Sequence, residues 1–280
     1  MKQLKYLPIL LSFSVFFSAH GQSPESIIEE MYERVMDASG HSFTLVMNER
    51  IDGDLEQSTM ECKVHYSSER IYTKMTGGEN KGAEILYNPD VYGSKALIKK
   101  GIKIKLDPKS SMMRKGMHNL LTDAGFQTPA ILLYESMATA KDQGILKEAF
   151  ELSGSVTFDG KSCYKIMIQD PNFKITNYTV SKSQSLSKLA KSLHLSEYML
   201  AEINGWRVGK SLSAGDIVKV TSAYGKTSIF YIDKSTFLPV YQRITDHKGN
   251  LFEEYKFTDI IVNPSFSSSD FSEDNPKYTF

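Results

Sequence analysis

The stretch NYTVSKSQSLSKLAKSLHLSEYMLAEINGW, from Asn177 to Trp206, lies between two strand patterns and decides how the chain is organised. It opens as a short strand and continues as two helices, for which Ser185 and Ser196 are suitable N-caps. A closing strand pattern follows at residues 217–220. Apolar residues at helical spacing predict a separate small core: Leu186, Leu189, Ala190, Leu193, Met199, Leu200 and Ile203. Because the end strands can pair, such a βααβ unit fits into a hairpin loop without disturbing a host sheet.

This unit, residues 177–221, resembles a LysM module, a family that binds N-acetylglucosamine-containing glycans such as peptidoglycan. The resemblance is carried by the opening YTV, the helical SLSKLAKSLHLSEYML, the INGW that follows, and the closing SLSAGDIVKV. One departure is that the family's Gly-Asp-Thr-Leu turn reads Ser-Gln-Ser-Leu here. In the family the glycan lies between this turn and the loop after the second helix. The resemblance therefore implies a glycan site at Ser183, Gln184, Ser185, Leu186, Asn204, Gly205 and Trp206.

Trp206 is the only tryptophan of the chain and has two interpretations. A flat indole with one N–H donor can stack on a sugar ring and bond a hydroxyl group. It can equally close the small core of the unit, as a partly buried tryptophan commonly does.

The sequence around the unit predicts an α+β fold. A helix is expected from Pro24, capped by Ser23, with Gly40 as its stop. Alternating strands follow with hairpin turns at Asp52-Gly53 and Lys248-Gly249, and a helical middle covers RKGMHNLLTDAGF and PAILLYESMATAKDQGILKEAF. Strands resume after that middle, and the tail from residue 264 is expected to be irregular. Hairpin-linked strands with helices on one face make a layered α+β architecture.

With the unit set aside, the remainder resembles the LolA-like half-barrel proteins. The matching features are Ile232-Asp233-Lys234, Leu238-Pro239, the Lys248-Gly249 hairpin and Val262-Asn263-Pro264. The resemblance implies a curved antiparallel sheet whose N-terminal and lid helices enclose an apolar cavity, in a superfamily that ferries lipoproteins or other acylated cargo. The expected organisation is a signal peptide at 1–21, a half-barrel at 22–176 and 222–280, and the LysM-like unit at 177–221.

An apolar cavity also follows from the side-chain pattern, because one face of these strands must be buried beneath helices. The candidate lining residues are Phe43, Leu45, Met47, Met113, Met117 and Met137. Methionine is flexible and suits a surface that accepts varied acyl chains, although it also fills irregular cores. A possible lipid or acylated cargo and a solidly packed interior are both consistent with the pattern.

The N-terminus predicts export. Lys2 and Lys5 precede an apolar run from Leu7 to Ala19 that is short for a membrane span, and Gly21 marks a cleavage site before residue 22. The alternative interpretation is a buried apolar strand. No other run is long enough to cross a membrane, so we expect a soluble periplasmic or secreted protein without a transmembrane segment.

Charge and cysteine content limit the function classes. The 280 residues contain 33 Lys and Arg and 33 Asp and Glu, so the whole chain exerts no long-range attraction on nucleic acid or on an anionic membrane. The two cysteines, Cys62 and Cys163, lie in strand patterns and could be bridged or free. They lack the spacing of a zinc or redox site.

No catalytic constellation is evident, and neither a cofactor nor a metal is expected. The histidines after residue 21 are scattered: His41, His65, His118, His194 and His247. Ser185 and Lys188 match a Ser-x-x-Lys pattern, but a helix start explains both residues. The adjacent pairs Glu29-Glu30 and Glu253-Glu254 are expected on solvated faces.

The function expected is a non-catalytic envelope protein whose unit binds peptidoglycan glycan and whose half-barrel binds a lipid or acylated ligand. The alternative is a structural protein or protein-interaction scaffold with a packed half-barrel and a degenerate LysM unit.

Overall fold

The computed structural model describes residues 22–114 and 116–280, so the predicted signal peptide lies outside the described residues. The first helix, α1 (Pro24–Asp37), begins where the sequence predicts, because the Ser23 side chain accepts a hydrogen bond from the backbone N–H of Ser26. It buries the apolar stripe Ile27, Ile28, Met31 and Val35. The helix ends at Asp37, so Gly40 does not stop it and instead opens the first strand.

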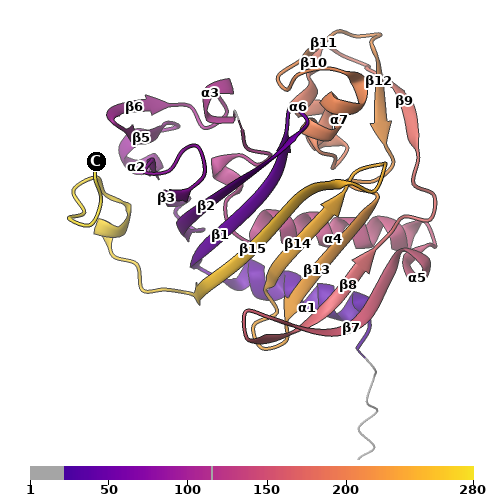
Figure 1. The fold of residues 1–280 in the computed structure, drawn as a ribbon, viewed down its shortest axis with the longest axis horizontal. Helices are drawn as coiled ribbons and strands as arrows, with labels where there is room; N and C mark the ends of the chain where they lie inside the picture. The colour runs from indigo at the N-terminus through magenta and orange to yellow at the C-terminus, as the bar shows by residue number, and fades with distance from the viewer. Residues whose placement is uncertain (1–21, 115) are drawn as a thin grey trace, which may run out of the picture.

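Eleven antiparallel strands form one open sheet in the described part of the chain (Figure 1), in the order β6-β5-β4-β3-β2-β1-β15-β14-β13-β8-β7. The N-terminal strands are β1 (Gly40–Ile51), β2 (Asp54–His65), β3 (Arg70–Gly77), β4 (Glu84–Tyr87), β5 (Ala96–Lys100) and β6 (Ile102–Leu106). The others are β7 (Phe150–Phe158), β8 (Lys161–Ile168), β13 (Thr227–Asp233), β14 (Pro239–Thr245) and β15 (Leu251–Val262). Pairing of β1 with β15 joins the two halves of the sheet.

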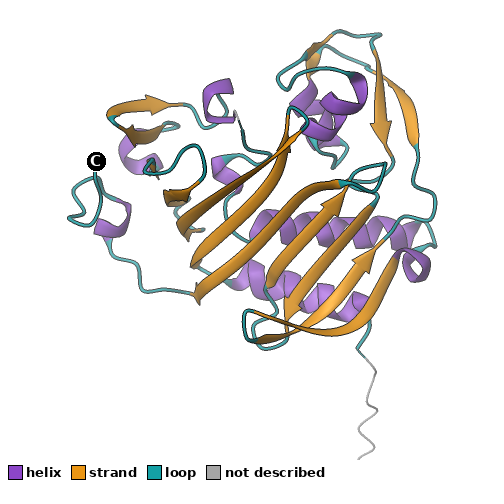
Figure 2. Ribbon diagram, viewed as in Figure 1, coloured by secondary structure: helices purple, strands orange, loops and turns teal. Residues whose placement is uncertain are grey.

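Helices cover one face of this sheet, which confirms the α+β class (Figure 2). The long helix α4 (Gln127–Asp142) runs beside α1, and the rings of Tyr32 and Tyr134 stack between them with centroids 4.3 Å apart. Shorter helices are α2 (Pro89–Tyr92), α3 (Ser111–Arg114), α5 (Leu146–Ala149) and the 3₁₀ turns η1 (Leu121–Asp123) and η2 (Ser268–Phe271). None of the helices in the described ranges is both long enough and apolar enough to cross a bilayer.

A βααβ unit occupies the connection between β8 and β13. It consists of β9 (Ile175–Thr179), β10 (Gln184–Ser185), α6 (Leu186–Ser192), α7 (Glu197–Asn204), β11 (Ser211–Leu212) and β12 (Ile217–Thr221). The end strands β9 and β12 pair with each other, while β8 and β13 pair directly in the main sheet. The two helices lie where the sequence predicts them, with Ser185 and Ser196 as their caps. A core of its own includes Leu186, Leu189 and Leu200.

The unit is also packed firmly on the sheet. Tyr198 and Met199 of α7 form a buried cluster with Ile51 at the end of β1 and Phe252 in β15. The Tyr198 hydroxyl donates to the carbonyl oxygen of Arg114, 2.8 Å away, and the Arg114 side chain pairs with Glu197. Helix α7 is therefore a structural part of the molecule at this end of the sheet.

The structure corrects one local expectation and adds detail to two others. The segment after α3 is largely irregular up to Phe126 rather than helical, and Gly116 and Gly125 adopt positive φ angles there. The tail is irregular as expected, but Phe271 anchors it in a small core with Tyr72 and Leu86. Both cysteines are free and buried.

Candidate functional site

A cavity of about 610 Å³ lies between the helix-covered face of the sheet, α4 and the turn between α6 and α7. The strands supply a predominantly apolar wall that includes Met60, Met75, Ile85 and Phe230, and α4 supplies Leu132 and Leu133. Leu193, His194 and Leu195 line it from the βααβ unit. This volume falls within the roughly 300–1,000 Å³ range of ligand sites in proteins.

Five of the six residues proposed from sequence for a cavity line this one. Phe43, Leu45 and Met47 alternate along β1 and therefore share a face of the sheet, and Met113 and Met117 come from the segment around α3. Met137 does not line the cavity, because it faces the buried core from α4. The periodicity shows that Met137 is buried but does not show on which side of α4 the open volume lies.

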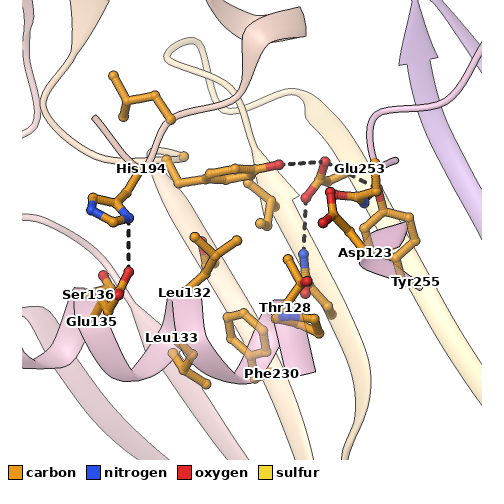
Figure 3. A pocket seen from close by; sticks show the side chains of 18 of the residues that line it. Asp123, Thr128, Leu132, Leu133, Glu135, Ser136, His194, Phe230, Glu253 and Tyr255 are labelled. Atoms are coloured by element: carbon orange, nitrogen blue, oxygen red, sulfur yellow. Dashed lines mark hydrogen bonds and ion pairs between the residues drawn. The ribbon is translucent and has the colours of Figure 1, made fainter. Parts of the chain in front are cut away.

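Polar groups lie toward both ends of the cavity, with apolar residues between them. Figure 3 shows Asp123, Glu253 and Tyr255 on one side and the Glu135–His194 pair on the other, with Leu132 between. The His194 Nδ1 atom is 2.9 Å from Glu135 Oε2, which links the α6–α7 turn to α4. Burial raises the pKa of Asp123.

The charged lining is acidic. Five carboxylate residues line the cavity: Asp123, Glu135, Asp142, Asp170 and Glu253. Among the described lining residues there is neither lysine nor arginine. A bound anionic group would therefore find neither a lysine nor an arginine as an ion-pair partner in this described lining, whereas hydroxyl, amide or ammonium groups would find acceptors.

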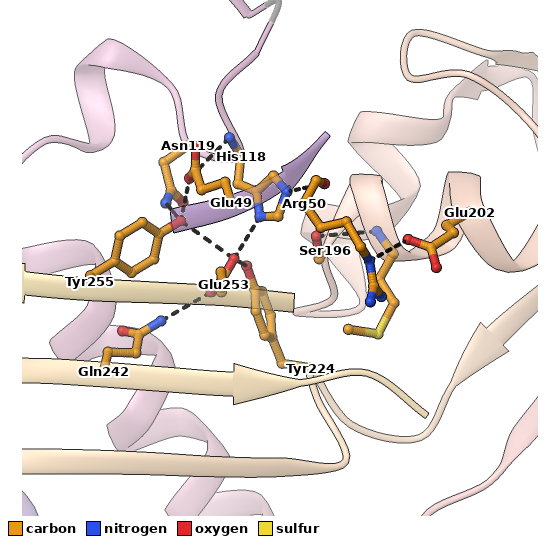
Figure 4. A network of polar contacts seen from close by, with 11 residues as sticks. Glu49, Arg50, His118, Asn119, Ser196, Glu202, Tyr224, Gln242, Glu253 and Tyr255 are labelled. Carbon is orange, nitrogen blue, oxygen red and sulfur yellow. Dashed lines mark hydrogen bonds and ion pairs between the residues drawn. The ribbon is translucent and has the colours of Figure 1, made fainter. Parts of the chain in front are cut away.

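A buried polar network adjoins this cavity at the end of the sheet (Figure 4). The Glu253 side chain, only 1% exposed, accepts hydrogen bonds from Gln242 Nε2 at 3.0 Å and from the Tyr224 hydroxyl at 3.3 Å.

His118 and a second carboxylate complete the network. His118 Nδ1 lies 2.8 Å from the Glu253 carboxylate, and His118 Nε2 lies 3.0 Å from the carbonyl oxygen of Arg50. The hydroxyl of Tyr255 donates to Glu49, which is 3% exposed. The buried carboxylates of Glu49 and Glu253 thus lie in one network with an imidazole and two phenols.

The network changes the acidity of its members. Burial alone would lower the pKa of His118, but the hydrogen bond to Glu253 and the charges of Glu49 and Glu253 outweigh it and raise that pKa. Burial raises the pKa of Glu49, and His118 partly opposes the rise. The buried hydroxyls of Tyr224 and Tyr255 have pKa values well above the usual range. A protonated His118 therefore compensates part of the negative charge.

Arg50 connects this end of the sheet to the βααβ unit. Its guanidinium bonds Asp246 at 2.7 Å in the β14–β15 turn and Glu202 of α7 at 3.0 Å. Arg50 packs over the ring of Phe252, 5.4 Å from the centroid. Ion pairs and apolar packing therefore hold α7 against the same strand ends that carry the network.

Sequence reasoning missed this network. Glu253 and Glu254 were expected on a solvated face, and that prediction was wrong, because Glu253 bonds the network and Glu254 accepts a hydrogen bond from Tyr241 on the other side of the sheet strand. The position of His118 in the sequence did not indicate the network, because its partners lie more than sixty residues away along the chain. The available signal was the alternation of β15, which puts Glu253 on the face of Tyr255 and Phe257.

The residues proposed for glycan binding lie on two adjoining loops of the βααβ unit. Gln184 pairs with Leu212, and the backbone N–H of Leu186 donates to Lys210, so the turn before α6 lies beside the loop after α7. Ser183 and Ser185 are exposed, but both hydroxyls accept backbone hydrogen bonds.

The remaining members of this set differ in what their side chains can offer. Leu186 is fully buried, and the Asn204 amide bonds the backbone of Leu200 and Lys219. Gly205 caps α7 in a left-handed conformation. Trp206 is half-buried against the unit's core, with the Lys210 ammonium 5.7 Å from its ring centroid. Trp206 and Gln184 therefore offer partly exposed surface that no side-chain hydrogen bond within the described ranges engages.

The described ranges contain no group of three or more His, Cys, Asp or Glu side chains arranged to hold a metal ion. In the network, the contacts of Glu253 and His118 are made to neighbouring protein groups. These contacts hold the Glu253 and His118 side chains in fixed positions at one end of the apolar cavity.

The chain is similar to one family of sequences and, at low identity, to several solved structures. No curated protein matches this sequence. Among solved structures, the chain is similar to a chain of the MucA/MucB complex of Pseudomonas aeruginosa (9% identity, TM-score 0.41), covering 89% of this chain and 60% of that one. It is also similar to a LolA superfamily protein from Nitrosomonas europaea (10%, TM-score 0.30, covering 90% and 99%). A third similarity is to lipoprotein LppX of Mycobacterium tuberculosis (9%, TM-score 0.38, covering 87% and 97%).

The strongest assignment comes from a family profile. Residues 38–197 and 204–280 match the family described as "Protein of unknown function (DUF1571)". The matched ranges contain all eleven strands of the main sheet and most of the βααβ unit. The chain therefore belongs to the DUF1571 family.

Proposed function

We propose that this chain is a non-catalytic ligand-binding protein of the cell envelope that holds the apolar part of a lipid or acylated molecule in its central cavity. The observation that carries the proposal is the cavity of about 610 Å³ walled by Phe43, Leu45 and Met47. An interior filled solidly by side chains would leave no such volume, since protein cores are close-packed. The sheet with α1 and α4 corresponds in this proposal to a LolA-like half-barrel.

The polar groups of the cavity favour one class of ligand. Asp123, Glu253 and Tyr255 would receive the polar end, while apolar side chains surround the chain. Because carboxylates dominate the charged lining, a neutral or cationic amphiphile is preferred over one with a carboxylate or phosphate in the cavity.

Displacement of a fluorescent lipid probe tests this function. A fatty alcohol, a fatty amine and a fatty acid of equal chain length are compared as competitors. The alcohol and the amine are expected to displace the probe at concentrations about tenfold lower than the acid. Equal displacement by all three would contradict the proposed ligand class, and absence of any probe binding would contradict a lipid site altogether.

A cavity-filling variant provides the structural control. Leu45→Trp places an indole in the cavity and is expected to weaken probe binding about tenfold or more. Leu55→Trp adds the same group at a β2 position whose side chain is 54% exposed and should leave binding unchanged. Circular dichroism of both variants verifies that the fold is retained.

Peptidoglycan binding by the βααβ unit is the second candidate function. The observation that favours it is the half-buried Trp206 on the loop beside Gln184. Deleting the unit would be an ambiguous test, because Leu193 and Leu195 line the cavity and Met199 packs on the sheet.

A point variant avoids that ambiguity. Trp206→Ala should abolish co-sedimentation with purified peptidoglycan sacculi, because it removes the exposed ring surface. Ile217→Ala, at a 63% exposed position of the same unit, is the matched control and should sediment normally. If Trp206→Ala sediments as well as the unmodified protein does, or if neither sediments, the glycan site is absent from this loop.

A further inference from the structure

A strongly basic hairpin forms one edge of the sheet. Between residues 95 and 109 the chain carries six lysines and a single carboxylate, Asp107. These lysines lie on or next to β5 and β6, and β6 is the edge strand. The zero net charge of the whole chain conceals this local excess of positive charge. Unlike charges spread over a surface, six charges on one hairpin create a local potential that acts within a Debye length.

Most of this charge is available for an external partner. Within the described part of the chain, one hairpin lysine forms an ion pair. This is Lys103, which pairs with Glu273 at 2.5 Å. Lys100 bonds the carbonyl oxygen of Glu79 and the Asn80 amide, and Lys105 lies over the ring of Tyr92. Neither Lys100 nor Lys105 forms an ion pair within the described ranges, so the hairpin keeps an excess of positive charge.

Large apolar side chains are exposed at the same end of the molecule. Ile102, at the tip of the hairpin, is 74% exposed, and Met112 on α3 is 67% exposed. Figure 1 shows α2 and α3 close to the β5–β6 hairpin, which forms one edge of the sheet. Isolated exposed apolar residues are ordinary, but here they accompany the densest positive charge of the chain.

The lysines surround the tip rather than forming one flat face. Lys99 pairs with Lys103, and Lys100 pairs with Ile102, so the two pairs point to opposite faces of the hairpin. A partner that meets both faces of the tip must enclose it. The headgroup layer of a bilayer does so, with phosphates around the lysines and acyl chains beneath Ile102.

We propose that the β5–β6 hairpin and α3 dock on the surface of an anionic lipid bilayer. The lysines supply electrostatic attraction, and Ile102 and Met112 enter the interfacial region. Lysines on an edge strand also prevent edge-to-edge pairing of sheets, but that role requires no exposed Ile102 or Met112. Met113, the neighbour of Met112, lines the cavity, so docking brings a cavity wall close to the membrane.

Vesicle flotation with the purified protein tests the docking surface. Vesicles of phosphatidylcholine with phosphatidylglycerol are compared with vesicles of phosphatidylcholine alone, at low and at high salt. The protein is expected to float with the anionic vesicles at low salt, and high salt should release it. Binding to both vesicle types alike, or to neither, would overturn the proposal.

Matched variants locate the interaction. Lys99→Gln, Lys100→Gln and Lys105→Gln together break no ion pair in the described structure and should weaken binding to anionic vesicles about tenfold or more. Lys182→Gln, Lys188→Gln and Lys219→Gln remove the same charge from exposed positions of the βααβ unit and should have little effect. Equal loss in both triple variants would assign the attraction to overall charge and overturn a local site.

The apolar contribution has its own pair of variants. Ile102→Ser should weaken vesicle binding several-fold without a change in charge, whereas Ile217→Ser, at the 63% exposed position in β12, should not. Probe binding to the cavity, measured without vesicles, is expected to be unchanged in all these variants. The docking proposal can therefore fail while the proposed ligand site stands, and the reverse also holds.

Discussion

At the scale of single residues, the most consequential side chain is Glu253. It lies in β15 beside Glu254, yet the two carboxylates face opposite sides of the strand and bind different partners. Glu253 is held by Gln242, Tyr224 and His118, so its charge is balanced by directed hydrogen bonds rather than by water. Removing one partner from such a network leaves a buried charge uncompensated, which is costly.

Substitution of His118 should therefore make stability respond differently to pH. The folded-state pKa of His118 is raised above its unfolded value of about 6.5, so its stabilising contribution is complete below that value and is lost as pH rises through the folded pKa. His118→Gln should cost on the order of 3 kcal/mol at about pH 6 and less at about pH 8. Urea denaturation of both proteins at the two pH values measures this difference. A difference that stays constant or grows with pH would refute the assigned charge state.

Gly40 marks a close approach between backbones at the start of β1. A Cβ atom there would lie 2.4 Å from the carbonyl oxygen of Val64 in β2. Gly40→Ala is therefore expected to lower the free energy of unfolding by about 1–3 kcal/mol. Gly77→Ala is the matched control, because its Cβ would meet the Thr59 side chain at 3.1 Å, which can move. Equal losses would show that backbone overlap is not the cause.

At the scale of elements, α7 decides how the βααβ unit relates to the sheet. The helix uses one side for the unit's own core, through Leu200 and Ala201, and another for the sheet, through Tyr198 and Met199. An element shared by two cores transmits disturbance from one to the other. A change in the packing of the unit is therefore expected to reach the cavity, because the α6–α7 turn helps to line it.

Truncation of Met199 tests this continuity. Met199→Ala should lower the free energy of unfolding by about 2–5 kcal/mol, because it leaves a cavity beside Ile51 and Phe252. Met36→Ala, at a 38% exposed position of α1, should cost little. Hydrogen exchange is expected to accelerate both in α7 and in the Leu193–Leu195 turn. Acceleration confined to α7 would show that the turn is held by α4 alone.

Elements governed by local pattern were predictable from the sequence, and those governed by distant partners were not. The Ser23 cap and the spacing of Ile27, Ile28 and Met31 specify α1, and the Ser185 and Ser196 caps specify α6 and α7. The segment after α3 has helix-like spacing, but tertiary contacts such as the pair His118–Glu253 override it. For the site, β1 alternation predicted the cavity wall, whereas the polar network joins strands and loops that are adjacent only in the folded chain.

At the scale of the whole molecule, the strand order separates the two cysteines. Cys62 in β2 and Cys163 in β8 have β1, β15, β14 and β13 between them. At the spacing of neighbouring strands this is about 24 Å along the sheet, far beyond the reach of a disulfide. Burial also raises the pKa of both thiols, which disfavours the reactive thiolate.

Both thiols should therefore remain free in an oxidising compartment. Mass spectrometry after alkylation is expected to show two modified cysteines in denaturant and none in the native protein. Reducing agent should leave the midpoint of thermal unfolding unchanged, because there is no bridge to break. A shift of that midpoint under reduction would contradict the strand order around β1 and β15.

The pairing of β1 with β15 has a consequence for how the molecule is made. His41 lies opposite Val262, so strands that are far apart in the sequence meet in the middle of the sheet. Contacts of such long range make folding slow, because a very large loop must close before they form. During synthesis β1 can pair with β2 in a hairpin, but its other edge has no partner strand until β15 has been made. The central pairing of the sheet can therefore form only after β15 has been synthesised, and until then the unpaired edge of β1 is open to chaperones.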